Sequence, residues 1–450
     1  MDPEEFFDLT ACVSGKAAFM ALSTRSSGCR PLVLIPQPFG SLVFERRTCR
    51  YLPFDAEATG LLLDLAGVGI DALVARTKEG FRRELVARFY EEFYEQGFFT
   101  VDGRLAGEIL DVAPPADHLT GPLAVHLSIS DTCNLGCLHC FAGEFSRQGT
   151  PLSLAELDRL FGQMARMGSY RLGLTGGEPL LRGDLFEIID LALANGLSPC
   201  VTTNGLLLDE PAARKFGGRD LLWLNVSLEG ACPATNDLVR GRGSFAQVMN
   251  NLRVLARHAR FSLAFTVMRT NLHEIGKCAE LALGVGAESA VFRPLYPVGA
   301  ARQHLDLMPT FEEYNSALEA LDNPGLRGIT QNCELNPFSP TIRQPASSVI
   351  YWNHGCGAGN SVCSISQSGE VNPCSFLGPE FEVGNVRDRS LSDLWRDVAL
   401  ERFRKPAANA APALTFNQGC RARSLWLKGS VDAPDPWIVE RGAISPGATS

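Results

Sequence analysis

Residues 123–141 read LAVHLSISDTCNLGCLHCF, in which a strand candidate at 123–130 runs directly into three closely spaced cysteines. Cys133, Cys137 and Cys140 have the spacing CxxxCxxC and would lie on the loop that follows the strand. Reactive loops of parallel α/β folds gather at the carboxyl ends of the strands. We therefore expect these cysteines to form a metal site at that end of a sheet.

The chain continues from this stretch as alternating strand and helix candidates. Such alternation favours a parallel sheet covered by outer helices. Six units fall short of the eight that close a full barrel, so residues 120–325 are predicted to form a partial, TIM-like (βα)6 barrel within an α/β protein. The expected strands cover residues 123–130, 170–177, 198–205, 221–230, 261–269 and 289–297, and the helices begin near Ser153, Asp184, Glu210, Phe245, Leu272 and Thr310.

Composition restricts the class of protein. The 450 residues carry a formal charge of −9, which argues against non-specific binding to nucleic acid. The sequence has no apolar run of about 18 residues, so no transmembrane helix and no membrane partner are expected. The acidic N-terminus lacks a secretion signal, which predicts a cytoplasmic protein. Its 14 cysteines then stay reduced, and clustered thiols indicate metal ligands.

The chemistry of the first cysteine group favours an iron–sulfur cluster. Three thiolates can ligate three irons of a [4Fe-4S] cubane and leave the fourth iron open. S-adenosylmethionine (SAM) can bind that iron through its amino nitrogen and carboxylate oxygen, and an electron from the reduced cluster then breaks a C–S bond. The alternative is a zinc site, which needs a fourth ligand. His139 lies between two of the cysteines, where it is poorly placed to serve as that ligand.

The run CxxxCxxCF resembles the radical SAM superfamily, in which an aromatic residue after the third cysteine packs near the adenine of SAM. Phe141 occupies that position. The second strand ends in TGGEP at 175–179, which resembles the family's GGE motif. A carboxylate is well suited to accept a hydrogen bond from an ammonium group. The resemblance implies a 5′-deoxyadenosyl radical that abstracts hydrogen, and contacts to the SAM amino group from Gly176, Gly177 and Glu178.

Two further segments resemble SAM-contacting positions of the same family. Ser227 and Glu229, in SLEG at the end of the fourth strand, resemble its S-x-D/E position near the ribose or the substrate. Arg240 resembles an arginine that pairs with the SAM carboxylate. Arg242 is an equally visible candidate for that role, and Asn204, in TTNG, is either a site residue or a turn residue.

A second cysteine group follows the barrel, in residues 326–430. The segment from Cys356 to Cys374 fits C-x12-G-x4-C and resembles the SPASM extension of radical SAM maturases. A full extension holds two auxiliary clusters, but only Cys420 follows here, with Cys333 as a reserve ligand. A structural zinc ribbon is the alternative. Residues 431–450 are expected to form a partly disordered tail. The resemblance implies one auxiliary [4Fe-4S] cluster, on Cys356, Cys363, Cys374 and Cys420.

Residues 1–110 precede a proline-bearing linker and are predicted to form a separate small α+β domain. Short strands around Gly40 are followed by helices, an order that resembles a PqqD-like, winged-helix peptide-recognition domain. In radical SAM enzymes that modify peptides, such a domain takes the leader peptide as an added strand on its sheet edge. The alternative is a plain structural domain.

Together these resemblances imply a radical SAM enzyme that reductively cleaves SAM and modifies a ribosomally synthesised precursor peptide bearing a leader. An electron donor such as flavodoxin or ferredoxin is expected as a partner. The alternative substrate is a small molecule, such as a haem precursor, a sugar or an antibiotic intermediate. A cluster-bearing electron carrier or regulator is a more distant hypothesis, since such a protein needs neither the GGEP segment nor a six-unit barrel.

Overall fold

The structure is a computed structural model. It describes residues 31–78, 80–142, 149–326, 330–332, 356–404, 419–437 and 439–440. The chain divides into two compact units, one formed by residues 1–120 with 338–352 and the other by residues 121–337 with 353–450. Cys333, the reserve ligand, lies outside the described residues.

In the described part of the N-terminal unit, a four-stranded sheet is accompanied by three helices. The strand order is β3-β2-β1-β4, with β1 to β3 antiparallel and β4 parallel to β1. Gly40 has a φ of +141° between β1 and β2, where a side chain would collide with the backbone of Asp55. The elements are β1 Leu32–Gln37, β2 Gly40–Glu45, β3 Arg50–Asp55, α2 Ala56–Val68, α3 Ile70–Arg76, α4 Gly80–Tyr94 and β4 Gly107–Ile109.

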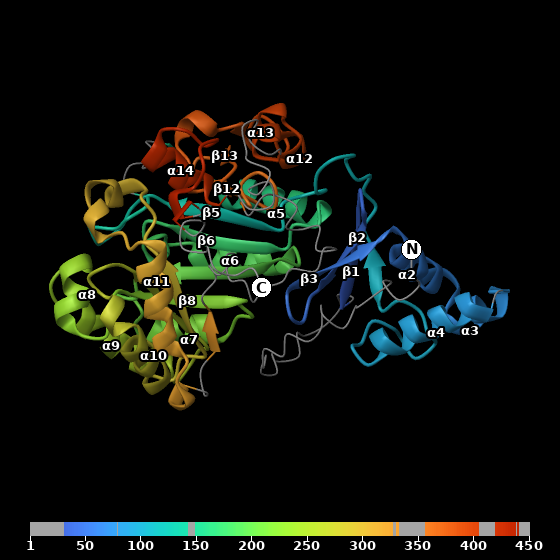
Figure 1. The fold of residues 1–450 in the computed structure, drawn as a ribbon, viewed down its shortest axis with the longest axis horizontal. Helices are drawn as coiled ribbons and strands as arrows, with labels where there is room; N and C mark the ends of the chain where they lie inside the picture. Colours follow the sequence, from blue (N-terminus) through green and yellow to red (C-terminus); the bar gives the residue numbers. More distant parts are fainter. Residues whose placement is uncertain are drawn as a thin grey trace, which may run out of the picture. The chain divides into compact units, whose positions relative to one another are not determined.

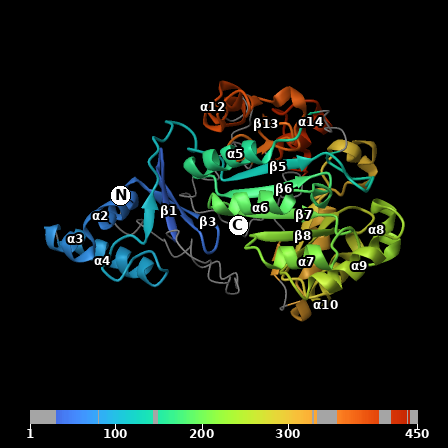
Figure 2. The ribbon, with the colours of Figure 1, turned by 180° about the vertical axis from the view of Figure 1, so that it is seen from behind.

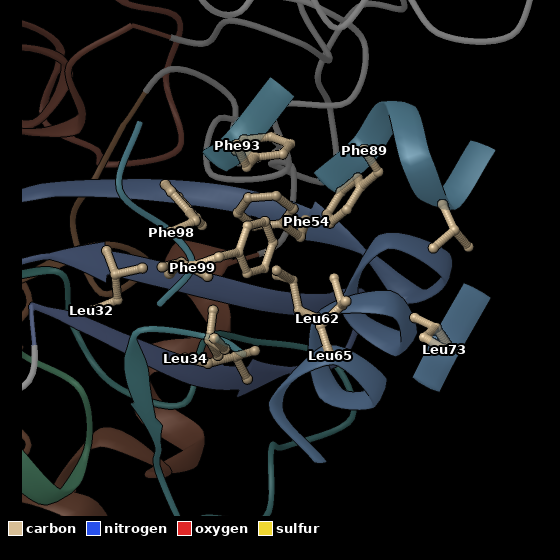
Figure 3. Packing of buried hydrophobic residues seen from close by; sticks show 13 residues of the cluster. Leu32, Leu34, Phe54, Leu62, Leu65, Leu73, Phe89, Phe93, Phe98 and Phe99 are labelled. Atoms are coloured by element: carbon tan, nitrogen blue, oxygen red, sulfur yellow. The ribbon is translucent and has the colours of Figure 1, made fainter. Parts of the chain in front are cut away.

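Aromatic side chains fill the core of this unit, as Figure 3 shows. The ring of Phe54, on β3, lies at centroid distances of 6.3, 5.3 and 6.0 Å from the rings of Phe89, Phe93 and Phe98. Leu62, on α2, is buried in the same cluster. Tilted and edge-on ring pairs each contribute about 0.5–1.5 kcal/mol beyond their buried area. The sheet and the helices of this unit therefore share one packed core.

The larger unit contains the partial barrel, and every strand expected from the sequence overlaps one of its six parallel strands. The predicted α/β fold is confirmed. An additional helix, α8, follows the fourth strand. The strands are β5 Ala124–Ser130, β6 Arg171–Gly176, β7 Ser198–Thr203, β8 Trp223–Leu228, β9 Ser262–Val267 and β10 Ser289–Pro294. The helices are α5 Leu154–Arg166, α6 Leu185–Ala194, α7 Glu210–Gly217, α8 Pro233–Arg240, α9 Ser244–Leu255, α10 Ile275–Gly284 and α11 Phe311–Leu318.

Local caps set the start of two of these helices. The hydroxyls of Ser153 and Thr310 accept hydrogen bonds from the amides of Glu156 and Glu313, whose side chains accept in return from the amides of the cap residues. Such capping boxes satisfy N–H groups that the first turn of a helix leaves without partners. The helix starts expected near Ser153 and Thr310 are confirmed.

The two faces of the barrel sheet differ in polarity. On β5, the buried side chains of Val125, Leu127 and Ile129 alternate with the more exposed His126 and Ser128. The neighbouring strands repeat this pattern. Full TIM barrels fill their interior with branched apolar side chains, so a polar face marks this sheet as the wall of a cavity. The polar face also carries Gly173, Thr175, Thr202, Asn225 and Ser227.

The C-terminal, cysteine-rich extension continues the barrel sheet, in the order β11-β10-β9-β8-β7-β6-β5-β12-β13-β14. β12 pairs in parallel with β5, and this pairing aligns Cys363 with Val125. Figures 1 and 2 show from opposite sides that the extension lies beside β5 and α5. The strand at the opposite edge of the sheet is β11 Thr330–Asn332. The elements of the extension are β12 Val362–Ile365, β13 Glu370–Asn372, β14 Gly384–Asn385, α12 Leu391–Trp395, α13 Glu401–Arg404 and α14 Arg421–Lys428.

Residues 431–437, at the start of the tail that is expected to be partly disordered, are folded. Trp437 is buried. The carboxylate of Asp435, also buried, accepts from the Arg423 side chain at 2.9 Å and from the Cys420 amide at 2.6 Å. Composition does not reveal such contacts, because they join residues more than ten positions apart. Residues 441–450 lie outside the described part of the chain.

Among the described residues, no single helix has the length and apolar character needed to cross a membrane. α2 and α3 meet the length and composition criteria only as a pair, across a bend of 114°.

Candidate functional site

The three cysteines of the first group lie on the irregular loop that leaves the carboxyl end of β5. Backbone hydrogen bonds fix this loop at two points. The Leu138 amide donates to the Val239 carbonyl at 3.1 Å, and the Cys140 carbonyl accepts from the Ala300 amide at 2.8 Å. Gly299 has a φ of +61°, and a side chain there would collide with the Cys140 carbonyl. The segment after β10 therefore packs closely against the end of the cysteine loop.

The thiols of this loop share one electrostatic environment. Burial raises the pKa of the Cys137 thiol to about 12, the Arg240 guanidinium opposes that shift, and the thiolates of Cys140 and Cys133 add to it. Within the described residues, no three His, Cys, Asp or Glu side chains converge on the position of a single metal ion. A cubane does not need its ligands to converge on one point, because each thiolate ligates a separate iron. Three neighbouring thiols beside a buried cation fit such an anionic cluster.

The TGGEP segment packs directly behind the cysteine loop. The Gly177 amide donates to the Ser130 carbonyl, and the Glu178 amide donates to the Thr132 carbonyl at 2.8 Å. A Cβ at Gly177 would collide with the carbonyl of Thr132. Gly176 has a φ of +133°, which favours glycine. Both glycines thus allow the end of β6 to lie against the residue before Cys133.

Glu178 is completely buried, and its carboxylate accepts hydrogen bonds from groups of the same chain. Oε1 accepts from the Thr203 hydroxyl at 2.6 Å and from the Leu180 amide at 3.1 Å, and Oε2 accepts from the Asn204 amide at 2.7 Å. Burial raises the pKa of Glu178, and these three donors oppose the shift. The carboxylate therefore holds together the strand ends of β6 and β7. Its contact with the SAM ammonium stays a prediction.

Glu178→Gln is expected to weaken SAM binding about ten-fold while leaving the iron content unchanged. The glutamine would present an NH2 group to one of the three donors around the carboxylate. A buried donor left without an acceptor costs about 1–3 kcal/mol, so the strand ends that flank the cysteine loop lose their anchor. Equilibrium binding of SAM and an iron assay measure the two effects.

Thermal unfolding of the SAM-free protein distinguishes anchoring from direct binding. Loss of an anchor lowers the melting temperature before any SAM is added, whereas loss of a ligand contact alone leaves it unchanged. Glu187→Gln, on the exposed side of α6, is the matched control. Unchanged SAM affinity in the Glu178 variant would remove Glu178 from the site.

Glu229, just after β8, is a second buried carboxylate beside the cysteine loop. Its Oε1 lies 3.0 Å from His139 Nε2 and 3.6 Å from Arg240 Nη1, and its Oε2 accepts from the Thr266 amide at 2.7 Å. His139 is therefore used as a partner of Glu229. This ion-paired group ties the loop between Cys137 and Cys140 to the end of β8.

The structure separates the two candidate arginines. Arg240 is buried at the end of α8 and donates to the Asn204 carbonyl at 3.2 Å, whereas Arg242 lies on an exposed turn. The Nε atom of Arg240 is buried and has no hydrogen-bond partner among the described residues. Arg240 therefore keeps a donor for an anion near the cysteine loop.

Asn204 directly follows β7, and Ser227 lies within β8. The Asn204 side-chain amide donates to Asn134 Oδ1 at 2.6 Å and lies 3.9 Å from Cys133 Sγ, so it joins the strand end to the cysteine loop. Ser227 is half-buried on the polar face of β8, in register with Ala264. The role of Asn204 was open in the sequence because TTNG is equally typical of a turn.

The second cysteine group brings three thiols together. Burial raises the pKa of Cys374, and the neighbouring thiolates of Cys356 and Cys420 raise it further. Burial also raises the pKa of Cys420 to about 12, with Arg423 opposing and Cys356 adding to the shift. For Cys363, in the middle of β12, burial alone raises the pKa to about 12. Unlike the pKa values of Cys374 and Cys420, the pKa of Cys363 carries no contribution from a neighbouring thiolate.

Around this second group, hydrogen bonds hold the cysteines in place. The Cys420 amide and the Arg423 guanidinium both donate to Asp435, and the Arg423 amide donates to Cys420 Sγ at 3.5 Å. The Arg423 guanidinium lies 3.9 Å from the centroid of the Trp437 ring. Three thiols near a buried cation again fit an anionic cluster. Sequence reasoning missed Arg423 and Asp435, because only the fold brings them to Cys420.

A pocket with about 660 Å³ of empty space, part of it open to solvent, lies between the polar face of the barrel sheet and the extension. The loop of Asp131 and the turn after β12 are joined beside it: the Asp131 amide donates to Gln367 Oε1 at 3.1 Å, and Gln367 Nε2 donates to Asp131 Oδ2 at 2.9 Å. One wall carries Ser128, Phe141 and Thr175, and the other carries Ser364, Glu370 and Cys374. Cys374 and Phe141, the residue after Cys140, thus line the same cavity.

Comparison with known proteins identifies the class to which this arrangement belongs. The radical SAM superfamily model matches residues 127–282, and the model of the SPASM iron–sulfur cluster-binding domain matches residues 356–421. Mycofactocin maturase MftC of Mycolicibacterium smegmatis is 30% identical over 334 residues, which cover 72% of this chain and 84% of that protein. The chain belongs to the radical SAM superfamily and carries a SPASM domain. It is an enzyme that uses a [4Fe-4S] cluster, SAM and an auxiliary iron–sulfur cluster.

Two further similarities bear on the substrate and the fold. AdoMet-dependent heme synthase of Methanosarcina barkeri is 28% identical over 341 residues, which cover 71% of this chain and 97% of that enzyme. The structure of Streptococcus suis SuiB bound to precursor peptide SuiA has the same fold, with a TM-score of 0.68 and 14% identity, over 91% of this chain and 98% of SuiB.

Proposed function

We propose that the enzyme modifies a ribosomally synthesised precursor peptide and that its N-terminal unit receives the leader of that peptide. The relation to mycofactocin maturase MftC supports a peptide substrate. The fold match to SuiB, a protein solved with its precursor peptide, carries the proposal for the N-terminal unit. Residues 121–450 make up less than three-quarters of the chain, so a match over 91% includes part of residues 1–120.

The sheet of the N-terminal unit offers an edge for an added strand. Among the described strands of this unit, β3 and β4 are the two outer ones, and β3, which pairs with β2, is the longer, with six residues against three. An extended peptide can pair with such an edge through backbone hydrogen bonds. Pro53 lies within β3, where it has no N–H to donate, and proline is tolerated in edge strands for this reason. We infer that β3 receives the leader, in a register set by Pro53.

The residues near the two cysteine groups have distinct proposed roles. When bound, the reduced cluster supplies the electron that cleaves SAM and releases a 5′-deoxyadenosyl radical for hydrogen abstraction. Phe141 flanks the adenine, and Arg240 directs its unused donor to the SAM carboxylate. A small protein such as flavodoxin or ferredoxin supplies electrons. The proposed cluster ligands are Cys133, Cys137 and Cys140, with Cys356, Cys374 and Cys420 for the auxiliary cluster; Cys363, the fourth ligand expected from the sequence, is not among them. The other proposed SAM-contacting residues are Gly176, Gly177, Glu178, Ser227 and Glu229.

A small-molecule substrate is the second candidate function. The heme synthase relative favours it, because almost the whole length of that enzyme aligns with this chain. The same alignment leaves more than a quarter of this chain without a counterpart in that enzyme. The fold match to SuiB spans 91% of this chain and so includes part of that quarter, which favours the peptide substrate.

Deleting residues 31–110 is expected to abolish modification of the precursor peptide and to preserve uncoupled SAM cleavage. The cysteine loop, the TGGEP segment and the pocket all lie in the larger unit, and the N-terminal unit has its own core. Mass spectrometry of short peptides encoded beside the gene and coexpressed with the enzyme measures the first effect. Assay of 5′-deoxyadenosine measures the second.

Tyr51→Pro is the finer variant for the same test. A second proline on β3 removes another N–H from the proposed docking edge and leaves the larger unit unchanged. Tyr94→Ala, at an exposed end of α4, is the matched control in the same unit. Turnover of a small molecule by the deletion variant, with no modified peptide from the complete chain, would establish the second candidate instead.

A further inference from the structure

An aromatic contact joins the two cysteine loops of the larger unit. Phe141 directly follows Cys140, and Phe376 lies two residues after Cys374. Their ring centroids are 5.5 Å apart, and the ring planes meet at 71°, an edge-to-face arrangement. Such pairs contribute beyond the apolar area that they bury. The segment after the third cysteine of one group thus packs on the segment after a cysteine of the other.

Phe376 is held by elements of the auxiliary cysteine group. Its amide donates to Cys374 Sγ at 3.5 Å, and its carbonyl accepts from the Trp426 indole at 2.9 Å. Trp426 lies on α14, the helix for which Cys420 is the N-cap. The position of the Phe376 ring therefore depends on the two segments that bring Cys374 and Cys420 together.

Tyr296 supports the same ring from a third element. Its ring centroid lies 4.9 Å from that of Phe376, and the Arg423 guanidinium lies 5.2 Å from the centroid of the Tyr296 ring. Tyr296 follows β10, in the segment whose Gly299 and Ala300 pack on the backbone of the cysteine loop. Phe376 thus contacts groups from both cysteine sites, and both rings are half-buried, with Phe141 lining the pocket.

We propose that Phe376 is a positioning residue for SAM: the auxiliary-cluster loop holds Phe376 against Phe141 and so fixes the ring that flanks the adenine. This inference rests on the role proposed above for Phe141. It gives the auxiliary site an effect on cofactor affinity that is independent of electron transfer. Loss of order around Cys374 would then weaken SAM binding even when Cys133, Cys137 and Cys140 remain intact.

Phe376→Leu in the complete, reconstituted enzyme tests the proposal. Leucine stays apolar and lacks the ring, so the dissociation constant for SAM is expected to rise about three- to ten-fold, the equivalent of one aromatic pair. The iron content should stay that of the wild type. Phe376→Tyr keeps the ring and should restore the affinity. Phe381→Leu is the matched control, because Phe381 lies in the same extension and contacts Phe403.

A double-mutant cycle gives a result that general damage to the extension would not produce. If Phe376 acts through Phe141, the double variant should bind SAM no more weakly than Phe141→Leu alone, because Phe376→Leu has no further effect once the Phe141 ring is absent. The EPR spectrum of the reduced SAM-binding cluster, recorded with and without SAM, reports the same contact. Should Phe376→Leu lose iron, Phe376→Met, which also lacks the ring, takes its place in the cycle with Phe141→Leu.

Wild-type affinity in the Phe376→Leu variant, or effects of the two substitutions that simply add, would overturn the proposal. Equal weakening by leucine and tyrosine would overturn it as well. These outcomes differ from failure of the proposed function, in which the wild-type enzyme cleaves SAM but modifies no peptide.

Discussion

Replacing Cys133, Cys137 and Cys140 together with alanine is expected to abolish reductive SAM cleavage and to lower the iron content from about eight to about four per chain. The three thiols adjoin one another on the loop after β5, while Cys356, Cys374 and Cys420 adjoin one another in the extension. Removing one group should therefore leave the other cluster in place. Anaerobic reconstitution, an iron assay and chromatography of 5′-deoxyadenosine measure the outcome.

The matched control replaces three cysteines outside both groups, Cys200, Cys232 and Cys278, with alanine. These residues lie on β7, before α8 and on α10, and their loss should leave both iron content and cleavage near the wild-type level. Persistent formation of 5′-deoxyadenosine by the first variant would contradict the central assignment. Loss of all iron from that variant would show that the two sites do not assemble independently.

Cys420→Ala is expected to remove the auxiliary cluster, whereas Cys363→Ala is expected to retain it. Cys420 caps α14 next to Cys356 and Cys374, with its amide bonded to the buried Asp435. Cys363 is buried in β12, where its neighbour on β5 is Val125. Iron content should fall by about four in the first variant, and Mössbauer spectra should lose the signal of the auxiliary site.

Each of these single substitutions is the other's control. Loss of the auxiliary cluster in Cys363→Ala would establish the four-cysteine set that the sequence favours. A retained cluster in both variants would direct attention to Cys333 as a ligand. With Cys420→Ala, SAM affinity also becomes informative, because the same helix carries Trp426, which bonds the backbone of Phe376.

The barrel could be predicted because its signals are local. Each strand and helix candidate is visible within about ten residues of sequence, and caps such as Ser153 with Glu156 mark helix starts. The cysteine loop and the TGGEP segment follow consecutive strands, so the parallel arrangement alone brings them to one edge of the sheet. Periodicity and spacing were sufficient for this part of the fold.

The remaining features depend on contacts between distant residues. Arg240 and Arg242 are indistinguishable in the sequence, and only the orientation of α8 buries one and exposes the other. The enclosure of Glu178 by donors from β7 is likewise a property of the fold. The spacing of Cys363 between Cys356 and Cys374 suited a ligand, yet this thiol lies inside the short strand β12 and no neighbouring thiolate contributes to its pKa. Spacing along the chain does not determine such separations.

The pairing of β12 with β5 has a consequence for the solubility of the folded chain. Without β12, the strand that leads into the cysteine loop would end the barrel sheet and expose a row of unpaired N–H and C=O groups. Bare edges of this kind are templates for aggregation with other chains. The extension pairs with that edge, so β14, which is only two residues long, becomes the outer strand of the sheet. The extension that carries the auxiliary cluster therefore also protects the edge of β5 from pairing with another chain.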